Sequence, residues 1–178
     1  MGGGPTRFGV LGDSISNDSV LEWPGLVRFG YRDNYATLSN HASAGESIAG
    51  HMATQVTAAA SDNANIIIIA LGTNDNNAGD MGALQATYEA GIVALKATNP
   101  NATIYAMNVL PRWEDETTGA EVDKSNIRTA IAAACTAQSV TCWDTYTTPW
   151  IDQDETVDGT HPDATGQAAI AAEVLSRL

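Results

Sequence analysis

The chain has 178 residues, of which 8 are basic and 21 are acidic, so its formal net charge at pH 7 is -13. This length fits one domain with a sizeable core, and the acidic surface disfavours nucleic acids and anionic membranes as partners. The longest apolar run, over 66–71, is too short to cross a bilayer. We therefore expect a soluble protein, for which the charge either favours neutral or cationic substrates or simply maintains solubility.

Residues 1–6 contain three consecutive glycines and are interpreted as a linker remnant ahead of one domain over 7–178. They also fit the loose N-myristoylation pattern, with Gly2 and Thr6 in place, but a run of glycines is more typical of added sequence. The segment lacks the basic and apolar regions of a secretory leader. The compartment is therefore left open, and secretion is expected only if a leader once preceded Arg7.

Strand-like and helix-like patterns alternate along the chain. In order, the patterns predict a strand over 7–11, a helix over 21–31, a strand over 35–39, a helix over 48–60, a strand over 66–71, a helix over 81–98, a strand over 103–109, a helix over 122–138, a strand over 140–143 and a helix over 164–178. The four isoleucines that begin the third strand are typical of a strand buried on both faces. The whole pattern predicts an α/β fold, a three-layer α/β/α sandwich around a five-stranded parallel sheet.

Polar residues follow the predicted strands, at the edge of a parallel sheet where ligands bind. Ser14 ends a Gly-Asp-Ser motif after the first strand, Gly45 follows the second, and Asn74 lies in Gly-Thr-Asn-Asp after the third. The loop before the last helix adds Asp158 and His161 in Asp-Gly-Thr-His-Pro. Each motif alone is common in turns and helix caps, but their combination indicates one composite site.

The residue types and spacing of these motifs suit nucleophilic catalysis. A serine hydroxyl needs a neighbouring base, and His161 is the candidate that could take the proton of Ser14 and return it to a leaving group. Asp158 precedes this histidine by three residues, which lets its carboxylate reach the imidazole Nδ1 and orient the ring. The neighbouring carboxylates Asp13 and Asp75 are instead expected to stabilise the local turns.

In this order and over nearly the whole chain, the motifs resemble those of the SGNH hydrolases, also called GDSL-type esterases and lipases. The resemblance implies a flavodoxin-like fold and an oxyanion hole made by the backbone N–H groups of Ser14 and Gly45 and the side-chain amide of Asn74. Relatives often carry an asparagine shortly before the glycine of the second block, where this chain has only the more distant Asn40. The last motif and the Gly-Gln-Ala-Ala helix after it are similar to those of microbial carbohydrate acetylesterases, small arylesterases and lysophospholipase-like thioesterases.

We therefore predict a serine-dependent hydrolase of short acyl esters, acetyl esters above all, of small molecules or carbohydrates, with neither cofactor nor metal. The alternatives are a thioesterase or lysophospholipase, or a non-catalytic module of flavodoxin-like or carbohydrate-binding type. The short chain leaves no room for a large lid, which favours short acyl groups. A full set of Ser14, His161 and Asp158 favours catalysis over the non-catalytic alternatives. The oligomeric state is left open.

Further residues carry weaker predictions. Trp113, after the fourth strand, and Trp150, in the long loop that follows the fifth strand, are candidate substrate contacts, although aromatic residues there can equally close the loops over the core. Cys135 and Cys142 could form a disulfide or remain two buried thiols. The cysteines and the three scattered histidines match no metal-ligand spacing, so no metal site is expected.

Overall fold

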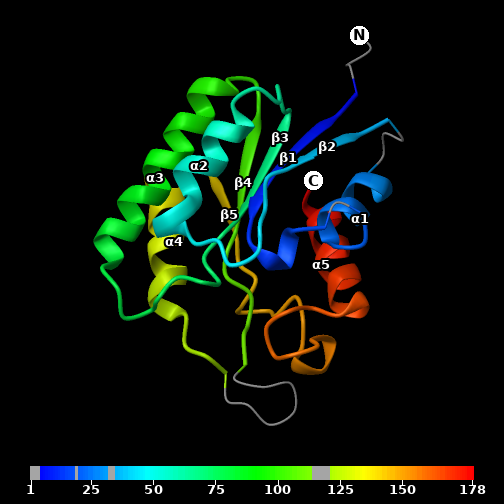
Figure 1. Ribbon diagram of the computed structural model, residues 1–178, viewed down its shortest axis with the longest axis vertical. Helices are drawn as coiled ribbons and strands as arrows, with labels where there is room; N and C mark the ends of the chain where they lie inside the picture. The colour runs from blue at the N-terminus through cyan, green and yellow to red at the C-terminus, as the bar shows by residue number, and fades with distance from the viewer. Residues whose placement is uncertain (1–4, 19, 32–34, 114–120) are drawn as a thin grey trace.

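The computed structural model describes residues 5–18, 20–31, 35–113 and 121–178 (Figure 1). In chain order the elements are β1 (Arg7–Gly12), the 3₁₀ turn η1 (Ser14–Ser16), α1 (Trp23–Gly30), β2 (Thr37–Asn40), α2 (Ile48–Ala59), β3 (Ile66–Ala70), α3 (Met81–Thr98), β4 (Thr103–Met107), α4 (Ser125–Ala137), β5 (Thr141–Trp143), the 3₁₀ turn η2 (Gln153–Glu155) and α5 (Ala164–Arg177). Every predicted strand and helix has a counterpart in this order.

The five strands form one parallel sheet in the order β2-β1-β3-β4-β5. Helices α2, α3 and α4 cover one face of this sheet, and α1 and α5 cover the other (Figure 1). The predicted three-layer sandwich is thereby confirmed, and the strand order is that of flavodoxin-like folds. Because all strands are parallel, their carboxyl ends meet at one edge, where the loops after β1, β2 and β3 lie together.

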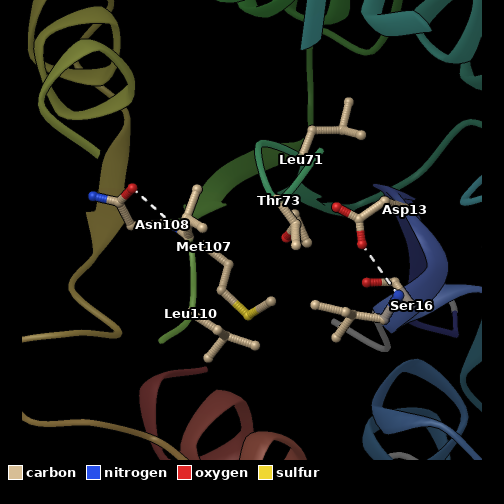
Figure 2. A pocket seen from close by; sticks show the side chains of 10 residues that line it. Asp13, Ser16, Leu71, Thr73, Met107, Asn108 and Leu110 are labelled. Atoms are coloured by element: carbon tan, nitrogen blue, oxygen red, sulfur yellow. Dashed lines mark hydrogen bonds between the residues drawn. The ribbon is translucent and has the colours of Figure 1, made fainter. Parts of the chain in front are cut away.

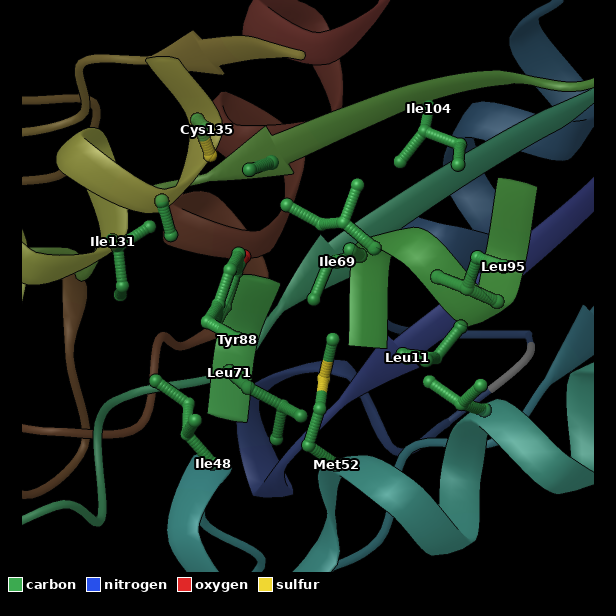
Figure 3. Close-up of a cluster of buried hydrophobic side chains, with 14 of the residues drawn as sticks. Leu11, Ile48, Met52, Ile69, Leu71, Tyr88, Leu95, Ile104, Ile131 and Cys135 are labelled. Atoms are coloured by element: carbon green, nitrogen blue, oxygen red, sulfur yellow. The ribbon is translucent and has the colours of Figure 1, made fainter. Parts of the chain in front are cut away.

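The core has two parts, one on each face of the sheet. The larger part lies under α2, α3 and α4 and includes Met52, Tyr88 and Ile69 (Figure 3). Alternate residues of β3 contribute to opposite parts, since Ile67 and Ile69 pack with the larger cluster and Ile68 with the smaller one. A strand between two helical layers needs apolar side chains at every position, which explains its unbroken isoleucine run.

The starts of two helices differ from the prediction by two or three residues. The helix predicted over 122–138 begins at Ser125, whose backbone N–H donates to the Asp123 carboxylate at 2.8 Å. The helix predicted over 21–31 begins at Trp23, with Pro24 in its first turn.

Cys135 and Cys142 are both free thiols. Among the described helices, none has both the length and the apolar character that a membrane span requires.

Candidate active site

Ser14 lies at the start of η1, separated from the end of β1 by one residue, in a turn held by three hydrogen bonds. The backbone N–H groups of Ile15 and Ser16 donate to the side chain and the carbonyl of Asp13, both at 3.1 Å. Asn40 at the end of β2 donates from its amide to the Ser16 carbonyl at 2.7 Å. Asp13 thus has the turn-stabilising contact expected of it, and Asn40, left without a role by its position in the sequence, supports the same turn.

His161 and Asp158 reach Ser14 from the opposite end of the chain. The Ser14 hydroxyl lies 2.9 Å from His161 Nε2, and His161 Nδ1 lies 2.6 Å from Asp158 Oδ2. The other oxygen of Asp158 accepts the backbone N–H groups of Thr160 and His161 at 2.9 and 2.7 Å. The carboxylate therefore fixes both the ring and its backbone, and an Nδ1–H donated to Asp158 leaves Nε2 free to accept the serine proton.

The Asp158 carboxylate is ionised more readily than an ordinary aspartate. Its partial burial raises the pKa, but the hydrogen bonds from the backbone and ring of His161 and from the backbone of Thr160 outweigh this effect and lower the pKa. The side chains of His161 and Asp158 are 44% and 50% exposed, so the pair opens to solvent. An ionised carboxylate at this place would stabilise an imidazolium that forms beside it.

The pKa of Asp13, one residue before the serine, is shifted in the opposite direction to that of Asp158. Its side chain is 1% exposed, and burial raises its pKa to about 6 despite hydrogen bonds from Ile15 and Thr73 and the nearby His161. Asp13, Thr73 and Met107 line a small cavity of about 10 Å³ beneath the turn (Figure 2). The carboxyl group is thus part of the buried support of Ser14 and is held away from bulk water.

The loops after β2 and β3 bring Gly45 and Asn74 together. Gly45 has φ +77°, a conformation that side chains rarely adopt, and a Cβ there would meet nothing within 4 Å. In the described part of the chain, no partner is found for its backbone N–H. Asn74 donates one amide N–H to the carbonyl of Glu46, the residue after Gly45, at 2.9 Å. The second amide N–H of Asn74 is not used by that bond.

Asp75 next to Asn74 has a structural role, as its place in the motif predicts. It is 4% exposed, and its carboxylate accepts the backbone N–H groups of Ile48 and Ala49 at 2.8 and 3.2 Å. These are donors of the first turn of α2, so Asp75 ties the β3 loop to the helix that follows Gly45.

The two candidate tryptophans, Trp113 and Trp150, differ in their burial and in their neighbours. Trp113 is half-buried, and its backbone N–H donates to the Gly159 carbonyl at 2.8 Å, which places it beside the loop of Asp158 and His161. Trp150 is 5% exposed and packs against Trp143, with ring centres 6.1 Å apart. The structure does not bring Trp150 to Ser14, because this ring closes its loop over the core.

Two buried glutamines that the sequence did not single out also support the site. Gln55 of α2 exchanges two hydrogen bonds with the backbone of Gly12, and Gln167 of α5 accepts from the Trp23 N–H at 2.8 Å and donates to the Ile15 carbonyl at 3.2 Å. Their positions in the sequence could have indicated this role, because each glutamine is a polar residue on the apolar stripe of its helix. Among the described residues, no group of three or more potential ligands is arranged to hold a metal ion.

Comparison with known structures finds this architecture in several hydrolases. A solved acetyl xylan esterase matches with a TM-score of 0.77 and 15% identity over 97% of this chain and 99% of its own. A psychrotrophic esterase from Pseudoalteromonas sp. matches with a TM-score of 0.73 and 16% identity over 96% and 95% of the two chains. A member of the lipolytic G-D-S-L family from Veillonella parvula matches with a TM-score of 0.72 and 20% identity over 97% and 100%.

At these identities the structural matches show a shared fold. No curated protein sequence matches the chain. The profile of the GDSL-like lipase and acylhydrolase family, however, matches residues 10–169. This span holds all four motifs at the sheet edge, and it covers far more than half of the sequence. The chain therefore belongs to the GDSL-like lipase/acylhydrolase family, whose assignment indicates an esterase.

Proposed function

We propose that this protein is a serine-dependent carboxylic ester hydrolase in which Ser14 is the nucleophile, His161 the general base and Asp158 the residue that orients it. The observation that carries the proposal is the unbroken chain of contacts from Ser14 Oγ to His161 Nε2 at 2.9 Å and from His161 Nδ1 to Asp158 Oδ2 at 2.6 Å. Nucleophile, base and orienting carboxylate within hydrogen-bond reach are the signature of an activated hydroxyl.

In this mechanism Ser14 Oγ attacks the ester carbonyl carbon while His161 Nε2 takes its proton. The oxygen of the tetrahedral intermediate accepts hydrogen bonds from the backbone N–H groups of Ser14 and Gly45 and from the Asn74 amide. Collapse breaks the bond to the alcohol, which leaves with the proton of His161, and an acyl group remains on Ser14. Water then attacks the acyl group with the same histidine as base, which releases the acid and restores the serine.

We further propose short acyl groups, acetyl above all, on small-molecule or carbohydrate esters, with no metal required. Four hollows of about 200–370 Å³ occur among the described residues, and neither Ser14 nor His161 lines any of them. The exposed His161 and Asp158 side chains are consistent with an open site that admits a bulky alcohol. Trp113 beside Gly159 is a candidate surface for a sugar ring, and the fold match to an acetyl xylan esterase agrees with this substrate class.

A thioesterase or lysophospholipase activity is the second candidate, because exposed apolar side chains lie in the loops that carry the triad. Val157, directly before Asp158, is 57% exposed, and Val20 and Leu21, in the loop after Ser14, are 58% and 74% exposed. A longer acyl chain lying on such side chains would gain about 25 cal/mol for each Å² of apolar surface covered.

The test is hydrolysis of p-nitrophenyl acetate, butyrate, octanoate and palmitate, with and without a metal chelator. We expect preference for acetate, no effect of chelator, and loss of activity in Ser14→Ala. In Asn74→Ala we expect a fall in kcat of about 10²–10³, the usual effect of removing one oxyanion donor. Ser176→Ala, an exposed serine near the end of α5, is the matched control and should retain full activity.

Each other outcome has a defined consequence. Turnover that rises with chain length would support the thioesterase or lysophospholipase candidate with the same triad. Loss of activity with chelator would contradict metal independence. Equal activity in Ser14→Ala and the unmodified protein would contradict the serine mechanism, and inactivity of the unmodified protein on every ester would favour a non-catalytic binding module.

A further inference from the structure

Gln55 makes an unusual pair of hydrogen bonds with the strand that leads to Ser14. Its side-chain oxygen accepts the backbone N–H of Gly12 at 2.8 Å, and its side-chain nitrogen donates to the Gly12 carbonyl at 2.7 Å. The glutamine is 3% exposed, so both bonds form away from water. Gly12 is the last residue of β1 and is separated from Ser14 by Asp13 alone.

The pairing of β1 with β2 explains why a side chain is needed there. Asn40, the last residue of β2, lies opposite Val10, so no residue of β2 lies opposite Gly12. The strand partner of Gly12 on the other side is Ala70 of β3. On the β2 side the Ser43 N–H donates to the Gly12 carbonyl at 3.3 Å, and the Gly12 N–H is left to Gln55. The amide of Gln55 therefore acts as a short extension of the sheet, one that continues β1 up to the nucleophile turn.

The same amide reaches the loop that carries Gly45. The Gln55 side-chain nitrogen also donates to the carboxylate of Glu46, and the Glu46 carbonyl accepts the Asn74 amide at 2.9 Å. One buried side chain thus contacts the end of β1 and the loop after β2, and that loop in turn holds Asn74. These are the three segments from which the oxyanion donors of the proposed mechanism come.

We propose that Gln55 is a positioning residue, which holds the nucleophile turn and the oxyanion loop at a set separation. This inference rests on the proposed esterase function and adds to it a residue of α2 that touches neither substrate nor the reacting atoms. Catalysis by aligned donors is sensitive to small displacements, because a shift of about 1 Å can cost about 10²-fold in rate. Loss of the Gln55 contacts should therefore weaken stabilisation of the tetrahedral intermediate more than ground-state binding of substrate.

The test compares Gln55→Met, which keeps the side-chain length and removes both polar atoms, with Asn99→Leu. Asn99 is a buried amide of equal exposure, 3%, at the end of α3, and it donates to the Ala59 carbonyl at 3.3 Å. The readouts are kcat and KM for p-nitrophenyl acetate and the inhibition constant of phenylboronic acid, which forms a tetrahedral adduct with an activated serine. Melting temperature reports the effect on folding.

In Gln55→Met we expect kcat to fall about tenfold to a hundredfold, with KM changed less than about threefold and the boronate bound more weakly by about the same factor as kcat/KM falls. Asn99→Leu should lower the melting temperature but keep kcat and boronate affinity within about twofold of the unmodified protein. Glu46→Ala removes a half-buried partner and leaves the two bonds to Gly12, so it should fold and lose about threefold to tenfold in kcat.

The inference is overturned if Gln55→Met folds and has the kcat and boronate affinity of Asn99→Leu. It is also overturned if Gln55→Met does not fold and Glu46→Ala matches the unmodified protein in both readouts. Failure of the proposed function gives a different result, because the unmodified protein would then hydrolyse no ester or would be unaffected by Ser14→Ala.

Discussion

Asp13 and Asp158 are two carboxyl groups of one site with opposite electrostatics. Asp158 has a half-exposed side chain and three hydrogen-bond donors, which lower its pKa, whereas Asp13 is 1% exposed and its burial raises the pKa to about 6. The contrast follows from the balance between lost hydration and hydrogen bonding to the charged form. The two carboxyl groups therefore have different roles, since Asp158 is kept ionised beside His161 and Asp13 lies buried under the turn of Ser14.

The raised pKa of Asp13 predicts how its substitution changes the pH dependence of stability. Between its ordinary pKa of 3.8 and about 6, the folded protein binds more protons here than the unfolded chain does. The Asp13 contribution therefore lowers the free energy of unfolding as pH rises through this window, by about 3 kcal/mol in total. Asp13→Asn keeps an oxygen for the Ile15 N–H and cannot ionise, so it should remove this loss.

Urea unfolding at pH 4, 5, 6 and 7 measures the effect. The free energy of unfolding of Asp13→Asn should increase relative to the unmodified protein as pH rises. Asp158→Asn is the matched comparison of opposite sign, because a lowered pKa contributes stability that is present at neutral pH and lost on acidification. Parallel curves for Asp13→Asn and the unmodified protein would contradict the assignment.

At the scale of elements, α2 and α3 approach closely where α3 has a glycine. A Cβ on Gly91 would lie 2.2 Å from Met52 Cε and 2.8 Å from its Cγ. Met52 is 1% exposed and belongs to the core cluster between the helices and the sheet (Figure 3). A glycine within a helix is unfavourable by itself, so this one is explained by the space that Met52 occupies.

Gly91→Ala should therefore destabilise the protein by about 1–3 kcal/mol, the usual cost of overfilling a packed core. Gly82→Ala is the control in the same helix, because Gly82 is exposed and its Cβ would meet only an Asp80 carboxylate oxygen at 3.3 Å. We expect this control to stay within about 1 kcal/mol of the unmodified protein. The measurement is the free energy of unfolding of both variants in urea. Equal values for Gly91→Ala and Gly82→Ala would show that Met52 moves aside at no cost.

At the scale of the whole molecule, one fold carries a large excess of negative charge. The formal charge is -13, with 21 acidic and only 8 basic residues. Mutual repulsion among these charges opposes the compact state, while salt screens charges that are more than about 10 Å apart at 0.1 M. Stability should therefore depend on ionic strength.

We expect the melting temperature to rise by about 2–4 °C between 10 and 200 mM NaCl, which corresponds to about 1 kcal/mol for a domain of this size. KCl at the same ionic strength should give the same rise, because screening does not depend on which monovalent cation is present. A melting temperature that is constant or falls with salt would show that local ion pairs outweigh the net repulsion.

The sequence by itself determined the order of the elements and the fold class. Alternating apolar patterns reflect burial of one or both faces of a strand or helix, and this information is local, as the isoleucines of β3 illustrate. The sequence also predicted that the motifs around Ser14, Gly45, Asn74 and His161 form one site, because the carboxyl ends of parallel strands meet at one edge of the sheet. Helix ends were predicted less accurately, as at the start of α4, where the Ser125 N–H donates to the Asp123 carboxylate instead of continuing the helix toward residue 122.

Only the tertiary structure decided which polar residues are buried and what they contact. Ser14 and His161 are separated by 147 residues, and their 2.9 Å contact depends on how the last loop packs against the first. The pKa of Asp13, the covered ring of Trp150 and the two bonds of Gln55 to Gly12 all depend on burial by distant segments. Burial of this kind is a property of long-range contacts, and the pattern of neighbouring residues does not contain it.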